Sequence, residues 1–112
     1  MPVLKNDGTV VSTLSVSTSK DFDYNLALHN SYGLSIQLVY SNAAGLTATA
    51  ELHASNDGIN FVVIPNTLVN LTTNGSTMWD VSNSAFKIVR VHYVRTAGTV
   101  DLTLTYNSLN FA

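Results

Sequence analysis

The sequence predicts an all-β protein, an antiparallel, jelly-roll-like β-sandwich of about seven to eight strands. Turn-forming sequences recur roughly every 8–12 residues, as they do in sandwiches. Between them, apolar and polar residues alternate with a period of two, and no segment carries a long helical period. With 112 residues, the chain is long enough to bury one core. We therefore expect a single domain over residues 1–112, with residues 1–8 as a candidate N-terminal arm.

The stretch at residues 46–64 gives the clearest element. Its first part alternates as a strand does when one face is buried and the other is wet. The apolar members of this alternation are Leu46, Ala48, Ala50, Leu52 and Ala54. Residues 55–58, Ser-Asn-Asp-Gly, suit a tight turn because Gly supplies positive φ and Asn and Asp tolerate it. A second apolar run at 61–64 ends at Pro65, so the stretch is predicted to be a β-hairpin.

The other elements follow the same two signals, alternation and turn residues. We expect strands at residues 9–16, 22–29, 34–40, 67–72, 76–81, 86–95 and 99–106. Turns or loops are expected at residues 6–8, 29–33, 41–45, 73–75 and 96–98. The spacing at 22–29 also allows a short helix. Residues 82–85 could form one helical turn capped by Ser or Asn.

The amino-acid composition limits the classes of function that fit this chain. Charged residues make up only 11% of the chain, against roughly 25% in ordinary domains, and weakly charged surfaces tend to associate. A Thr/Ser-rich β protein without a partner is an equally good interpretation. The five basic residues are scattered, so we expect no nucleic-acid partner. No apolar run reaches about 18 residues, so no membrane partner is expected. The lack of a signal-peptide pattern and of cysteine favours synthesis in the cytoplasm.

No pattern of reactive side chains predicts an enzyme. The three histidines, His29, His53 and His92, have no metal-binding spacing, and there is no cysteine to complete a zinc site. His53 lies on the polar face beside Glu51, where a solvated pair is the favoured interpretation. No serine lies in a GxSxG sequence, and no acid is placed opposite a base. We therefore predict no catalytic residue, no cofactor and no metal.

Two groups of residues are candidates for contacts with other molecules. If Val89, Val91 and Tyr93 point inward, Ile88, Arg90 and His92 share the opposite face of their strand. A mixed face of this kind fits a subunit contact, where Arg is enriched, although an ordinary exposed Arg is as good an interpretation. The apolar Leu109 and Phe111 complete the candidate interface. Separately, Trp79 is a candidate sugar-stacking residue, although aromatic residues on strands more often belong to the core.

Two long segments carry a family resemblance. They read SIQLVYSNAAGLTATAELHASNDGINFVVIP and MWDVSNSAFKIVRVHYVRTAGTVDLTLTYN, and they resemble small β-sandwich structural proteins of tailed-phage virions. The matching features are residues 37–40, 55–58, Phe61, Ile64, 86–91, Gly98 and 100–106. The resemblance spans roughly residues 33–107 and leaves residues 1–32 uncovered.

The resemblance implies a non-enzymatic virion component, a capsid decoration (cement) protein that binds the major capsid protein lattice. It also implies homo-oligomers on the capsid surface, and it carries over no catalytic residue. Two alternatives remain open at this stage. One is a phage neck, tail or fibre module, and the other is a carbohydrate-binding β-sandwich for host attachment, which would need an exposed Trp79 or a cluster of tyrosines.

Overall fold

The computed structural model describes the backbone over residues 4–25, 31–81 and 86–111, and the side chains over 10–25, 33–81 and 86–108. This part of the chain contains strands and no helix. The strands are β1 (Leu4–Val16), β2 (Lys20–Asn25), β3 (Ser31–Ser55), β4 (Val62–Val63), β5 (Val69–Leu71), β6 (Gly75–Val81) and β7 (Ile88–Phe111). All of their pairings are antiparallel.

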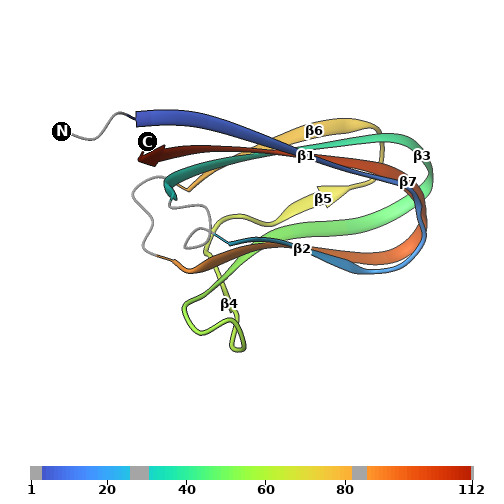
Figure 1. Cartoon of the computed structure of the whole chain (residues 1–112). Helices are drawn as coiled ribbons and strands as arrows, with labels where there is room; N and C mark the ends of the chain where they lie inside the picture. The colour runs from blue at the N-terminus through green and yellow to red at the C-terminus, as the bar shows by residue number, and fades with distance from the viewer. Residues whose placement is uncertain (1–3, 26–30, 82–85, 112) are drawn as a thin grey trace.

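The long strands β3 and β7 form a ribbon that belongs to both layers. They pair from Ser31 opposite Asn110 to Ser55 opposite Ile88, and the ribbon folds over near its middle (Figure 1). One layer has the order β1, second half of β7, first half of β3, β6. The other has β2, first half of β7, second half of β3, then β5 and β4. This arrangement confirms the predicted all-β, antiparallel sandwich, and its jelly-roll-like topology stays a prediction.

The fold of the ribbon lies at residues 41–47 of β3 and around Gly98 of β7. Positive φ occurs at Asn42, Gly45 and Gly98, and the register shifts repeatedly between Ser41 and Ala48. These are β-bulges, which bend and twist a strand without ending it. The predicted loop at 41–45 and tight connection at 96–98 are therefore wrong as chain reversals. Both segments continue their strands and carry them from one layer to the other.

The core lies between the two layers and follows the period-two pattern. The predicted alternation at 46–54 is confirmed, since its apolar members are buried and Thr47, Thr49, Glu51 and His53 are not. Its β7 counterparts Val89, Val91 and Tyr93 are also buried. The other buried hydrophobic residues are Val16, Tyr24, Leu34, Ile36, Leu38, Leu71, Trp79, Val100, Leu102, Leu104 and Tyr106.

The remaining elements differ from expectation mainly at their ends. The hairpin at 46–64 is present, although β4 contributes only two paired residues. The turn predicted at 6–8 is wrong: these residues continue β1, where Gly8 lies opposite Asn107, because pairing with β7 overrides the local turn preference. The strand expected at 22–29 is β2, whose predicted continuation past Asn25 lies outside the described residues, as does the helical turn at 82–85. Of the turn expected at 29–33, residues 31–33 belong to β3.

Gly98 is predicted to be indispensable to the bend. A Cβ at this position would collide with the carbonyl oxygens of Ala44 and Gly45, and φ is +82°. We expect Gly98→Ala to lower the free energy of unfolding by roughly 3 kcal/mol. Gly45→Ala is the matched control, because φ is +59° there but the Cβ would meet open space. It should lose only about 1 kcal/mol. Equal losses in chemical denaturation would contradict this account of the bend.

Removal of the hydroxyl group should affect the free energy of unfolding differently at two core tyrosines. The buried Tyr93 hydroxyl has no hydrogen-bond partner among the described residues, and burial raises its pKa. The buried Tyr24 hydroxyl donates to Ser108 Oγ at 3.0 Å. We expect Tyr93→Phe to leave the free energy of unfolding unchanged or raise it by about 1 kcal/mol, and Tyr24→Phe to lower it by about 1 kcal/mol. Thermal unfolding checks both, and a loss on Tyr93→Phe would be inconsistent with an unpaired hydroxyl.

Candidate functional site

The outer face of the layer formed by β2, β7 and β3 carries a cluster of charged and titratable side chains. Register places them in two rows of three across the strands. One row is Asp21, His92 and Glu51, and the other is Asp23, Arg90 and His53. We call these six residues the charged cluster. It forms because each strand places its polar members outward while its apolar members fill the core.

Arg90 is the centre of the charged cluster. Its Nε donates to Asp23 Oδ1 at 2.7 Å, and its Nη2 donates to Asp23 Oδ2 at 3.1 Å. A second carboxylate, Asp21 Oδ2, lies 3.6 Å from Nη1. The guanidinium stacks on the ring of Phe61, 3.6 Å from its centroid. The hydrogen bond to Asp23 raises the pKa of Arg90, so this side chain is charged and held in one position.

The two histidines of the charged cluster lie against each other, each beside a carboxylate. His92 Nδ1 is 2.6 Å from Asp21 Oδ1, and His53 Nε2 is 2.9 Å from Glu51 Oε1. Their ring centroids are 4.5 Å apart. The expected pairing of His53 with Glu51 is therefore present. Within the described residues, no group of three or more His, Asp or Glu side chains is arranged to hold a metal ion.

The structure brings three of the predicted interface residues together. Ile88, Arg90 and His92 face outward on β7, opposite to the buried Val89, Val91 and Tyr93. Ile88 lies under the turn at 55–58, where its Cδ1 would be 3.6 Å from a Cβ at Gly58. The side chains of Leu109 and Phe111 lie outside the described residues. A contact role for these five residues stays a prediction.

Trp79 does not offer its ring to a ligand. Its side chain belongs to the core, with 7% of the residue exposed, and its Nε1 donates to the carbonyl of Thr67 at 3.0 Å. The sugar-binding alternative depended on an exposed Trp79 or on a cluster of tyrosines. Tyr24, Tyr93 and Tyr106 are also buried, so these four aromatic side chains serve packing rather than a surface platform.

The turn at 55–58 is built around the carboxylate of Asp57. This carboxylate accepts hydrogen bonds from the backbone N–H groups of Asn60 and Ile59 at 2.8 Å each. It also accepts from the Asn60 amide at 2.8 Å and the Ser55 hydroxyl at 2.9 Å. These bonds, the backbone bond from Asn60 first, lower the pKa of Asp57 well below its ordinary value. The turn is therefore held together by hydrogen bonds that converge on one carboxylate.

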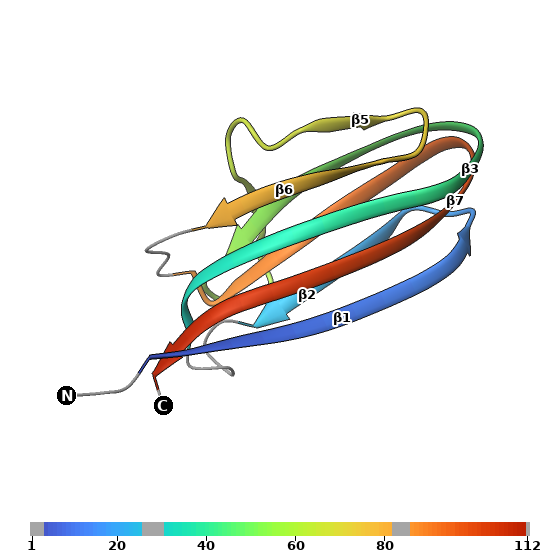
Figure 2. The same cartoon turned by 90° about the horizontal axis from the view of Figure 1, so that it is seen from above.

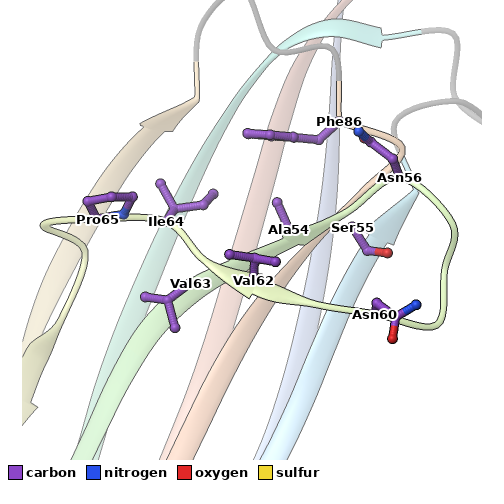
Figure 3. A pocket seen from close by; sticks show the side chains of 9 residues that line it. All are labelled: Ala54, Ser55, Asn56, Asn60, Val62, Val63, Ile64, Pro65 and Phe86. Carbon is purple, nitrogen blue, oxygen red and sulfur yellow. The ribbon is translucent and has the colours of Figure 1, made fainter.

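A pocket of about 260 Å³ lies beside this turn (Figure 3). Its lining residues are Ala54, Ser55, Asn56, Asn60, Val62, Val63, Ile64, Pro65 and Phe86. None of them is titratable, and the two amides are already engaged. Asn56 Oδ1 accepts from the Lys87 backbone N–H at 3.3 Å, and Asn60 Nδ2 donates to Asp57. The Ser55 hydroxyl is engaged too, because it donates to Asp57 Oδ1 at 2.9 Å, and no titratable group lines the pocket to act as an acid or a base.

The outer face of the other layer is almost free of charge. One row across its strands is Val10, Thr105, Gln37 and Met78, and the next is Ser12, Thr103, Val39 and Ser76. We call these eight residues the uncharged face. This face cannot be recognised in the sequence, because its members come from four strands and share a surface only through register.

The described residues include no helix that could span a membrane.

No protein-family model and no curated protein sequence matches the chain. Among solved structures, the SPBc2 prophage-derived protein YomS is similar with a TM-score of 0.64 and 10% identity, over 95% of this chain and 96% of that one. A disulfide-linked pilus protein of Bacillus endospore appendages is similar with a TM-score of 0.54 and 12% identity, over 98% and 91%. The Tobacco streak virus coat protein gives a TM-score of 0.46 and 9% identity, over 92% and 85%. At such identities these likenesses show the fold alone.

The Asp57 turn makes a prediction about acid stability. Because the pKa of Asp57 is lower in the folded chain than its ordinary value of 3.8, its stabilising effect is complete above that value. The effect disappears as the pH falls through the lowered pKa. Asp57→Asn should therefore be less stable than wild type at about pH 7, with a smaller difference at about pH 2. Urea unfolding at a series of pH values measures this, and a pH-independent difference would refute the assignment.

Proposed function

We propose that the chain is a non-enzymatic structural protein of a phage particle, and specifically a capsid decoration protein that binds the major capsid protein lattice. The observation that carries the proposal is the likeness to the prophage-derived YomS over nearly the whole of both chains. The resemblance of residues 33–107 to tailed-phage virion proteins points the same way. We place the protein on the outer surface of the capsid, after synthesis in the host cytoplasm.

The chemistry of the described surfaces supports a structural role. The charged cluster pairs its own charges, and the pocket beside the Asp57 turn is lined by no titratable group. This sequence contains no cysteine, so any assembly would be held by noncovalent contacts, unlike the disulfide-linked pili.

We further propose that the lattice contacts the charged-cluster side of the molecule through Ile88, Arg90 and His92. Leu109 and Phe111 belong to the second half of β7, which lies in the other layer, so we propose them as a separate contact. Arg90 is held flat against Phe61 by Asp23. Such a preordered guanidinium loses little conformational entropy on binding. Contact with this side would leave the strand edges available for contacts between copies in a homo-oligomer.

The test uses capsids of the encoding phage that lack this protein. Purified protein should co-sediment with them in a fixed stoichiometry. His92→Ala should weaken this binding about tenfold if the charged cluster contacts the lattice. Met78→Ala is the matched control, because Met78 is exposed on the opposite outer face, and it should leave binding unchanged.

Four outcomes would count against the proposal, each against a different part of it. Absence of stoichiometric binding would exclude the decoration role. Immunogold labelling of the neck, tail or fibres of intact virions would replace it with the tail alternative. Absence of the protein from purified virions would overturn the structural role altogether. Equal effects of the two substitutions would move the lattice contact away from the charged cluster.

A further inference from the structure

The two layers of the sandwich end in free strand edges, and most of these edges are protected against pairing with another chain. The edge strand β2 carries the exposed charges of Lys20, Asp21 and Asp23. At the far edge of the other layer, β6 has seven residues and carries the exposed Asp80. The strands β4 and β5 have only two and three residues. Charge and shortness are the usual means by which proteins prevent edge-to-edge association.

The edge strand β1 is not short, and it carries charge only in its first half, at Lys5 and Asp7. It has 13 residues, and among the described strands it pairs with β7 alone, along one side (Figure 2). Residues 10–16, VVSTLSV, include no charged residue and no proline. A strand in this position directs alternate N–H and C=O groups at an empty edge, where they can pair with a further strand.

The same edge also exposes apolar side chains. Val10 is 65% exposed and Leu14 is 73% exposed. Val11 is 37% exposed although it lies beside the fully buried Leu104 of β7. Neighbouring residues of a strand point to opposite faces, so Val10 and Val11 make both sides of the β1 edge apolar. Such an edge is best covered by a strand that is itself apolar on both sides.

We propose that a second copy of this chain covers the β1 edge by antiparallel pairing of β1 with its counterpart across a two-fold axis. An antiparallel pair of identical strands is self-complementary. Each contact between one residue of the first copy and another residue of the second copy occurs a second time with the copies exchanged. Residues 10–16 bring no like charges together. The layer of β1, β7, β3 and β6 then continues into the same layer of the second copy, and the uncharged face extends across both.

The corner after β1 sets the limit of this contact. Between Thr13 and Val16 the register shifts, and Ser15 has a φ of 50°. The Asp101 carboxylate fixes this corner, accepting from Asn42 Nδ2 and from the Ser15 backbone N–H at 2.7 Å each. Pairing is therefore confined to the part of β1 before Ser15. An interface of one strand pair falls at the small end of specific contacts, below about 1,200 Å², so association in the micromolar range is expected.

This inference specifies the contact within the proposed homo-oligomer, but it is tested on the purified chain alone. Its failure would leave the capsid-binding test unaffected. Sedimentation equilibrium should show a monomer–dimer equilibrium. Val10→Lys places a charge on the edge and should raise the dissociation constant by about tenfold or more. Val62→Lys is the matched control, since Val62 is 70% exposed on β4, and it should leave the dissociation constant unchanged.

A second measurement locates the contact without relying on the stability of the lysine variant. Single cysteines are introduced in turn at Val10, Val11, Ser12 and Thr13 of this cysteine-free sequence. Rapid disulfide-linked dimers are expected at one or two neighbouring positions, and none at Ser76→Cys on β6. A monomer at all concentrations up to about 1 mM would overturn the inference. So would equal weakening by the two lysine substitutions, or crosslinking that is no faster on β1 than at Ser76.

Discussion

The bend of the β3–β7 ribbon is the constraint on which the rest of the structure depends. The ribbon contributes two neighbouring central strands to each layer, so every other strand is placed by pairing with one half of it. Gly98 packs against the backbone of residues 44 and 45 at this bend, with no room for a side chain. The bends of β3 and β7 lie side by side in the ribbon, so both strands pass from one layer to the other at the same place. This shared bend brings the apolar faces of the two layers together.

Much of the fold follows from the period of two. The alternation at 46–54 identified the buried face of β3. The strand predicted at 86–95 is apolar on both sides, so its buried face could not be identified from the sequence. The bends could not be recognised in the same way. Asn and Gly adopt positive φ in a hairpin turn and in a β-bulge alike, so residues 41–45 and 96–98 resemble chain reversals. Only the pairing between distant segments decides that both strands continue.

The sequence predicts which residues of the candidate site share a strand face, but not which side chains bond to one another. The period of two predicts that Ile88, Arg90 and His92 share a face, but it does not decide that this face points outward. The bonding of Arg90 to Asp23 depends on the register between segments 67 residues apart. The stacking of Arg90 on Phe61 depends on the course of the loop after the Asp57 turn. Neither long-range placement is contained in a local pattern, and both change the interpretation of Arg90 from a free cation to a paired one.

Most of the few acidic residues of this chain are engaged in specific contacts within the fold. Of the seven acidic residues, Asp21, Asp23 and Glu51 belong to the charged cluster, and Asp57 and Asp101 fix a turn and a corner. The other two acids, Asp7 and Asp80, lie in the layer that contains β1 and β6, but residues 10–16 of the edge strand β1 carry no charge. Because an unprotected edge favours strand pairing, this distribution leads to the β1 edge as the self-contact. The charged cluster, on the other layer, then remains free for a different protein.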